Sequence, residues 1–286
     1  IPSELARLSK VEAFSLGGNS LTSSIPSELA LLGNVEYLHF DLGDNSLSSS
    51  IPSELGRLMG RLSNVGTFYL DTNSLTSSIP SELALLSNVE SFDLTGNALT
   101  SSIPSELARL SKVEVFSLGT NFLTSSIPSE LALLSNNVEF WYFDLDTNSL
   151  TSSIPSELAL LGNVDYLHFD LHHNSLASSI PSELALLSNV RGFYLGDNAL
   201  SSSIPSELAL LSNVFDFNLG DNALTSSIPS ELALLSNLEE IFLNDNFLTS
   251  SIPSELALLS NAEAFTLGDN SLSSPIPSEM ALLSNV

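Results

Sequence analysis

The sequence lacks cysteine and has few basic residues. Of its 286 residues only 7 are Lys or Arg, against 33 Asp or Glu, so the formal net charge at pH 7 is −26. Without cysteine, neither a disulfide framework nor a thiolate metal site can form. The shortage of Lys and Arg argues against a nucleic-acid partner, because proteins bind a phosphate backbone through basic side chains.

Long apolar runs are missing as well. No run approaches the roughly 20 residues that cross a bilayer, and the chain does not open on the pattern of a signal peptide. Hydrophobic residues still make up 43% of the chain, which predicts a folded protein rather than a disordered one. The chain starts and stops inside a repeating pattern, so we expect an excerpt of a longer protein whose terminal caps are missing.

A short motif recurs along the whole chain. Self-similarity at this period predicts a solenoid, in which each repeat packs on its neighbours. Eleven full units and the start of a twelfth follow one another without a linker, so we expect a single domain over residues 1–286. The motif Ile-Pro-Ser-Glu begins at residues 1, 25, 51, 79, 103, 127, 154, 180, 204, 228, 252 and 276.

The apolar residues of each unit show two periods. In the first unit, Phe14 and Leu16 alternate with small or polar residues, which predicts a short strand with one buried face. Leu5 and Leu8 follow a Pro and a Glu, which suits a short helical or 3₁₀ turn. Asn19 recurs in every full unit, and its side-chain amide is expected to bond the backbone of its own coil and of the neighbouring coil.

From Val11 to Leu21, and on to Ile25 and Pro26, the first unit resembles LxxLxLxxNxLxGxIP, the repeat of plant-type leucine-rich repeat proteins. The resemblance implies an α/β solenoid of about 11 to 12 coils, with a parallel β-sheet on the concave face and short helical or 3₁₀ turns on the convex face. It also implies an extracellular or cell-surface setting, as in receptor-like ectodomains and secreted inhibitors of this family. One departure is Ser23, which stands where the family has glycine.

Equivalent residues of successive coils are expected to stack into columns. The column at mid-strand on the concave face is Ser15, Asp41, Tyr69, Asp93, Ser117, Asp144, Asp170, Tyr194, Asn218, Phe242 and Thr266. Near the strand ends lie Asp44, Asp71, Asp146, Asp197, Asp221, Asp245 and Asp269. A concave wall of one charge focuses its field. This favours a cationic protein or peptide as the partner and leaves divalent cations open; the alternative is a face that only keeps the protein soluble.

Aromatic and charged residues gather in units six to eight. Aromatic anchors among charges are typical of interface hot spots, so we predict a protein or peptide contact there. The alternative for the tryptophan is that it fills space created by the longer repeat. The predicted ligand-binding patch is Trp141, Tyr142, Asp144, Asp146, His168, Asp170, His172 and Tyr194.

No pattern for catalysis or a cofactor is present. The chain has neither a glycine-rich phosphate loop nor a zinc-helix motif, so we expect no enzyme and no cofactor. His168, Asp170 and His172 alternate along one strand, which raises the question of a metal. Residues four apart in a strand lie about 13 Å apart and do not converge easily, so we predict no metal site.

A column of hydroxyl residues precedes each Ile-Pro, as in Thr22-Ser23-Ser24. Regular hydroxyl arrays resemble those with which some leucine-rich repeat proteins bind ice, whereas Ser and Thr also cap turns. The preferred prediction is a non-enzymatic recognition or scaffold module that binds through its acidic concave face. The alternative is a structural or surface-active protein, ice-binding or associated with a cell wall, that uses this hydroxyl column.

Overall fold

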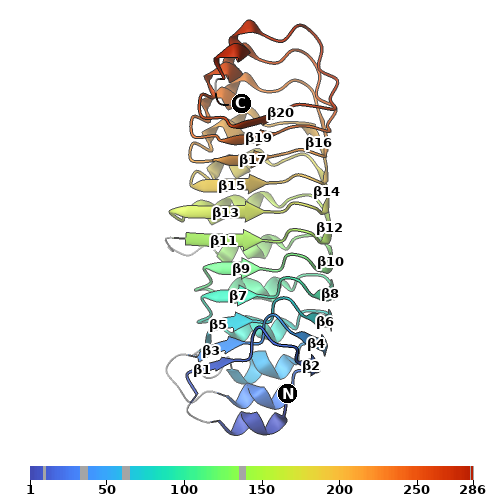
Figure 1. Cartoon of the computed structure of the whole chain (residues 1–286), viewed down its shortest axis with the longest axis vertical. Coiled ribbons are helices and arrows are strands. Elements are labelled where there is room, and N and C mark those ends of the chain that lie inside the picture. Colours follow the sequence, from blue (N-terminus) through green and yellow to red (C-terminus); the bar gives the residue numbers. More distant parts are fainter. Residues whose placement is uncertain (9–10, 33–37, 60–64, 135–139, 284, 286) are drawn as a thin grey trace.

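The protein is a curved rod of stacked coils (Figure 1). The structure is a computed structural model, and it describes residues 1–8, 11–32, 38–59, 65–134, 140–283 and 285. In most coils the chain passes through a strand of one sheet, a strand of a second sheet and a short helix before the next coil begins. The predicted α/β solenoid is therefore confirmed.

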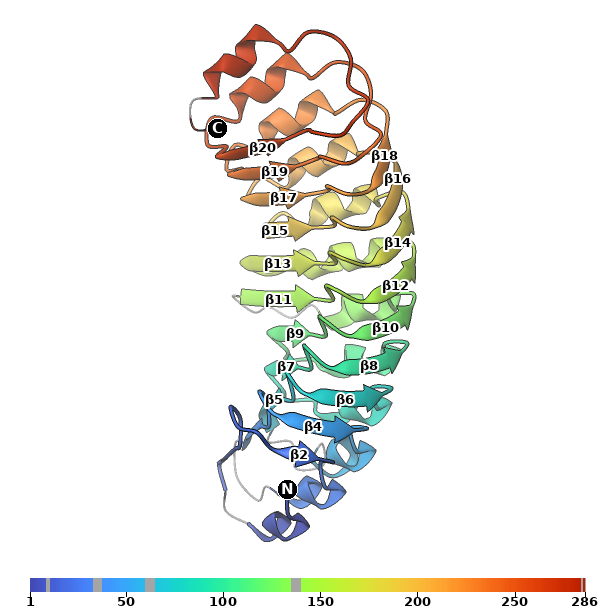
Figure 2. The same ribbon diagram turned by 45° about the vertical axis from the view of Figure 1, so that its right-hand side comes forward.

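Among the described residues, eleven parallel strands form the sheet on the inner side of the curve (Figure 2). Equivalent residues pair directly across it, as Phe14 does with Phe40 and Ser15 with Asp41. The predicted concave column is therefore correct. The strands are β1 (Ala13–Ser15), β3 (Leu38–Asp41), β5 (Val65–Tyr69), β7 (Ser91–Asp93), β9 (Val115–Ser117), β11 (Phe140–Asp144), β13 (Tyr166–Asp170), β15 (Val190–Tyr194), β17 (Asp216–Asn218), β19 (Glu240–Phe242) and β20 (Ala264–Thr266).

A second parallel sheet of nine strands, not expected from the sequence, carries the hydroxyl column. In this sheet the paired residues are not equivalent: Thr100 pairs with Phe122, whereas its counterpart in the next coil is Thr124. The hydroxyls are therefore offset from strand to strand. The strands are β2 (Thr22–Ser23), β4 (Ser46–Ser49), β6 (Ser74–Ser77), β8 (Ala98–Ser101), β10 (Phe122–Ser125), β12 (Ser149–Ser152), β14 (Ser175–Ser178), β16 (Ala199–Ser203) and β18 (Ala223–Thr225).

Short helices close the coils. In η4, Pro80 is the N-cap residue and Glu82 lies in the first turn, as the sequence predicts. None of the described helices is long and apolar enough to cross a membrane. Apart from η3, which is a π-helix, they are 3₁₀ helices: η1 (Ser3–Arg7), η2 (Ser27–Leu31), η3 (Leu55–Met59), η4 (Ser81–Leu85), η5 (Ser105–Arg109), η6 (Ser129–Leu134), η7 (Ser156–Gly162), η8 (Ser182–Leu186), η9 (Ser206–Leu210), η10 (Ser230–Leu234), η11 (Ser254–Leu258) and η12 (Ser278–Leu282).

A column of phenylalanine rings runs through the core. From Phe14 to Phe217 the rings of successive coils stack with centroids 5.4–5.9 Å apart and planes inclined by 11–19°. Each such pair contributes about 0.5–1.5 kcal/mol beyond the area it buries. The column therefore favours one register between neighbouring coils.

The asparagine column has the predicted structural role. Asn97 donates its side-chain N–H groups to the carbonyls of Leu94 in its own coil, at 3.0 Å, and of Leu70 in the preceding coil, at 2.9 Å. Its Oδ1 accepts the backbone N–H of Leu75 at 3.0 Å. A buried backbone group left without a partner costs about 1–3 kcal/mol, so this column joins each coil to the one before it.

The longer repeats change the inner sheet locally. In three longer repeats, strands β5, β11 and β13 are five residues long, whereas β1 has three. Strand β15, beside β13, reaches the same length in a repeat of ordinary length. The pairing register shifts between Leu38 and His39, and again between Leu167 and His168. The inner strands β5, β11 and β13 are thus extended in these repeats, while residues 33–37, 60–64 and 135–139 of the longer repeats lie outside the described residues. The longer strands add one more outward position per coil.

The Ser that replaces the family's glycine has a left-handed backbone. Its φ lies between 70° and 87° in all eleven coils that carry it, from Ser23 to Ser274. This conformation costs a residue with a Cβ about 1–2 kcal/mol, whereas glycine adopts it freely. The chain therefore carries backbone strain at the same point of every coil.

Replacing Ser101 by glycine is expected to stabilise the protein. The relief of the left-handed strain, about 1–2 kcal/mol, exceeds the entropy that glycine adds to the unfolded chain, about 0.5–1 kcal/mol. We expect Ser101→Gly to raise the thermal unfolding midpoint. The neighbouring Ser102 does not have a positive φ, so the control Ser102→Gly should lower it. If the unfolding midpoint fell in both variants, the left-handed backbone at Ser101 would not be strained.

Candidate functional site

The predicted patch lies on strands β11, β13 and β15, near the middle of the inner sheet (Figure 1). Tyr142 pairs with His168 and Asp144 pairs with Asp170. Asp170 in turn pairs with Tyr194. These five of the eight predicted residues therefore occupy adjacent positions on the outward face of three neighbouring strands.

The rings of the patch form an aromatic row. The Tyr142 and His168 rings are stacked, with centroids 4.2 Å apart and planes inclined by only 4°. The Tyr194 ring follows at 5.2 Å from His168. Offset or parallel ring contacts of this kind hold side chains in defined positions. The row therefore presents a fixed aromatic surface rather than three independent side chains.

Gly192 makes room for the third ring. A Cβ at Gly192 would lie 2.4 Å from Cε2 of Tyr194, so this ring lies over the glycine. The Tyr194 hydroxyl donates to Asp216 Oδ2 at 2.7 Å. Burial, together with this carboxylate, raises the pKa of Tyr194, and burial followed by the nearby Asp144 raises the pKa of Tyr142 to about 12. Both phenols therefore stay neutral and keep their hydroxyl proton at neutral pH.

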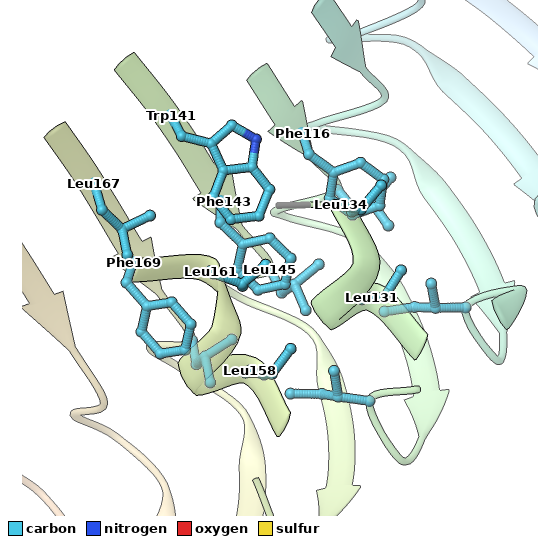
Figure 3. Close-up of a cluster of buried hydrophobic side chains, with 14 of the residues drawn as sticks. Phe116, Leu131, Leu134, Trp141, Phe143, Leu145, Leu158, Leu161, Leu167 and Phe169 are labelled. Atoms are coloured by element: carbon cyan, nitrogen blue, oxygen red, sulfur yellow. The ribbon is translucent and has the colours of Figure 1, made fainter. Parts of the chain in front are cut away.

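Trp141 does not belong to the patch, so the prediction that places it among the ligand-binding residues was wrong. Its side chain is 1% exposed and its ring centroid lies 5.3 Å from that of Phe143, within the cluster of buried hydrophobic side chains drawn in Figure 3. Successive residues of a strand point to opposite faces, so an outward Tyr142 places Trp141 inward. The alternative interpretation, that this ring fills interior space, is the correct one.

The aspartates of the concave column have a structural task. Asp41 Oδ1 accepts the backbone N–H of Gly43 at 2.9 Å, and Asp170 Oδ1 accepts that of His172 at the same distance. This is the Asx-turn, which ends these two strands. Asn218 performs the same task for Gly220 without a charge. The turn therefore needs only an oxygen acceptor, and it does not require the negative charge of the aspartates.

Asp144 is the most buried acid of the patch. Only 6% of the residue is exposed; Oδ1 accepts the N–H of Asp146 at 2.8 Å and Oδ2 accepts the hydroxyl of Ser117 at 2.7 Å. Burial raises the pKa of Asp144 to about 7, although these two hydrogen bonds oppose the rise. Asp144 therefore gains its charge near neutral pH.

The two histidines of the patch point to different partners. His168 Nε2 lies 3.7 Å from Asp170 Oδ2 in its own strand. His172 follows the strand end and places Nε2 2.9 Å from Asp197 Oδ2 of the next coil. Asp146 lies at the same level as His172, one coil earlier, and accepts the hydroxyl of Thr147 at 2.8 Å. Asp146 and His172 therefore form the edge of the patch rather than its centre.

A related cluster lies nearer the N-terminal end and was not among the predicted site residues. His39 Nε2 is 4.0 Å from Asp41 Oδ2, and its ring meets Tyr69 edge-on at 5.8 Å. A shallow hollow beside it is lined by Asp41, Tyr69, Asp71 and Asp93, among others. The signal was available in the sequence, because Tyr-Leu-His-Phe-Asp occurs both at 37–41 and at 166–170.

Comparisons with known proteins identify the repeat. The family model described as "Leucine Rich Repeat" matches residues 38–58, 88–110 and 237–259. A search of curated proteins finds no significant match. Solved structures, in contrast, match over most of the chain.

Two receptor structures are similar. The ectodomain of the Arabidopsis receptor kinase HAESA, bound to an extended IDA peptide hormone, has a TM-score of 0.84 and 29% identity, covering 99% of this chain and 45% of its own. PEPR1 bound to AtPEP1 has a TM-score of 0.65 and 26% identity, covering 100% of this chain and 45% of its own. The chain thus spans less than half the length of either receptor chain.

A third similar structure is a plant ice-binding protein, with a TM-score of 0.67 and 25% identity, covering 82% of this chain and 73% of its own. All three match the overall coiled fold of this chain. The coil sequence, the stacked sheets and these matches together show that the chain has the leucine-rich repeat fold, and they are consistent with a leucine-rich repeat protein of the plant type.

Proposed function

We propose that the chain is a non-enzymatic recognition module that binds a cationic protein or peptide along its inner sheet. The observation that carries this proposal is the aromatic row of Tyr142, His168 and Tyr194, which lies beside the carboxylates of Asp144 and Asp170. Flat rings supply contact area at little entropic cost, and the carboxylates select Lys or Arg side chains.

The surplus of charge supports a cationic partner. Asn218 ends its strand without a charge, yet four other coils use Asp at this position: Asp41, Asp93, Asp144 and Asp170. Each keeps a second carboxylate oxygen, although Ser15 and Ser117 donate to two of these. A wall of one sign attracts oppositely charged ligands and speeds their association.

The two receptor structures add support of a different kind. The HAESA ectodomain holds a peptide hormone, PEPR1 is bound to AtPEP1, and both share the fold of this chain at 26–29% identity. By analogy, we propose that the chain works outside the cell or at its surface, as part of a longer protein. Repeat proteins commonly bind through their concave surface, which is rigid and extended.

Removing the aromatic row should abolish peptide binding. Peptides selected from a displayed random library on the immobilised chain are expected to be rich in Lys and Arg. Each of the variants Tyr142→Ala, His168→Ala and Tyr194→Ala should weaken a selected peptide by about 2 kcal/mol, or roughly thirtyfold in Kd, as hot-spot residues do. Isothermal titration calorimetry measures the change.

The matched control removes an aromatic ring elsewhere. Phe122 lies in the second sheet and is 60% exposed, so Phe122→Ala should leave the Kd unchanged. Selected peptides without excess Lys or Arg, or a Kd that survives all three concave variants, would argue against the proposal.

Binding should strengthen as pH rises through about 7. Burial raises the pKa of Asp144 to about 7, so this carboxyl is neutral at pH 6 and charged at pH 8. One added charge pair at 4 Å contributes about 1 kcal/mol in water, or about fivefold in Kd. Asp144→Asn keeps an acceptor but cannot ionise, so its Kd should change less between pH 6 and 8 than that of the parent. Equal changes would show that Asp144 does not contact the ligand.

The second candidate function is binding to ice or to another ordered surface. It is favoured by the regular exposed hydroxyls of the second sheet, such as Thr76, Thr100 and Thr124, and by the likeness to a plant ice-binding protein. Two features oppose it: the offset pairing of this sheet and the exposed ring of Phe122 among the hydroxyls.

If the hydroxyl surface binds ice, bulky residues there should abolish inhibition of ice recrystallisation. Thr100→Tyr and Thr124→Tyr place large side chains on a surface that must lie flat against the crystal, and tyrosine is well tolerated in strands. Splat-cooling microscopy measures crystal growth, with Tyr142→Ala on the other sheet as the control that should stay active. A parent protein that leaves crystal growth unchanged would end this candidate.

A further inference from the structure

One cluster of metal-ligating side chains stands apart from the aromatic row. Within the described parts of the chain, His172, His173 and Asp197 are the one group of three such residues whose donor atoms all lie within 4.8 Å of one another. His172 Nε2 is 2.9 Å and His173 Nδ1 is 3.4 Å from the same oxygen, Asp197 Oδ2. The two imidazole centroids are 3.9 Å apart.

We propose that these three residues form a binding site for one divalent transition-metal ion, with Zn²⁺ as the reference ion. In a tetrahedral zinc site the metal–ligand bonds of about 2.0–2.2 Å place donor atoms roughly 3.3–3.6 Å apart. The His173 to Asp197 separation already falls in this range, and the His172 to Asp197 separation is shorter by less than an ångström. Water would supply the fourth ligand, since His173 is 55% exposed.

The backbone brings the three donors together. His173 has φ 49°, a left-handed conformation that His and Asp adopt more readily than most residues. This turn after the end of β13 directs both adjacent imidazoles to one carboxylate. Asp197 occupies the equivalent position of the next coil, also at φ 49°. The alternating sequence pattern concerns only residues along one strand, where His168 and His172 lie too far apart to share a metal. The contact between His173 and the next coil could not be seen in that pattern.

The donor set selects the class of ion. Two imidazoles with one carboxylate suit Zn²⁺ and its neighbours, whereas Ca²⁺ and Mg²⁺ prefer oxygen ligands. His173 and Asp197 line a shallow hollow together with Asp221, whose carboxylate adds negative charge near the proposed site. The other described His and Asp pairs, His39 with Asp41 and His168 with Asp170, each offer one imidazole and one carboxylate, at 4.0 and 3.7 Å.

Zinc titration of the chain tests the site, and it needs no peptide, so it is independent of the proposed recognition function. Calorimetry should show one tightly bound Zn²⁺ per chain at pH 7.5. The variants His172→Gly and His173→Thr introduce residues that neighbouring coils already have at the equivalent positions, Gly196 and Thr147 respectively. Both variants should therefore fold. Each should weaken Zn²⁺ by more than about tenfold, since even outer-shell partners of a metal contribute about 10–100-fold.

The control His39→Ser removes a histidine from a two-donor pair and introduces the residue that stands at this position two coils further on, Ser91. It should leave the Zn²⁺ affinity unchanged, and circular dichroism verifies that every variant is folded. A tenfold excess of Ca²⁺ should not displace the zinc. The proposal is overturned if the parent shows no saturable Zn²⁺ binding, if both site variants bind as the parent does, or if Ca²⁺ displaces the ion, which would indicate diffuse attraction to the acidic wall.

Discussion

The asparagine column is the constraint on which the rest of this rod depends. In each described coil after the first, its amide binds carbonyls of two successive coils, and its oxygen accepts an N–H from the coil before, as Asn97, Asn121 and Asn222 do. The phenylalanine stack adds a second coupling of the same period. Because both couplings repeat once per coil, chemically similar side chains on the inner sheet fall into columns, and a surface property such as charge extends along the whole rod.

Alignment of charge has an electrostatic cost that the structure partly offsets. Stacked carboxylates repel one another: burial and, after it, neighbouring acids raise the pKa values of Asp71, Asp144 and Asp221. Hydrogen bonds oppose the rise at Asp144, which accepts the backbone N–H of Asp146 and the hydroxyl of Ser117. A cationic ligand would remove the remaining repulsion, which gives the inner sheet a thermodynamic reason to bind one.

The features that follow from the repeat period could be predicted from the sequence. The features that depend on backbone conformation could not. The buried Phe14, the asparagine at residue 19 and the concave column follow from period and spacing, because one unit determines its eleven copies. Strand alternation should also have placed Trp141 inside, since Tyr142 and Asp144 were predicted to point outward. The second sheet was not foreseen, because its strands are short runs of Ser and Thr, residues that occur as readily in turns.

The left-handed positions connect strain with chemical variety. Every coil has two of them, one before the Ile-Pro pair and one just after the inner strand. The first is Ser in all eleven coils, with φ of 70–87°, and shows no variation. The second, with φ of 43–52° where it is not glycine, is occupied by Asp, Thr or His. A glycine there would relax the backbone but leave no side chain at the rim of the inner sheet. Strain accepted at this one position is therefore what allows each coil to carry its own polar group beside the concave surface, and His173 facing Asp197 is the place where two such groups meet.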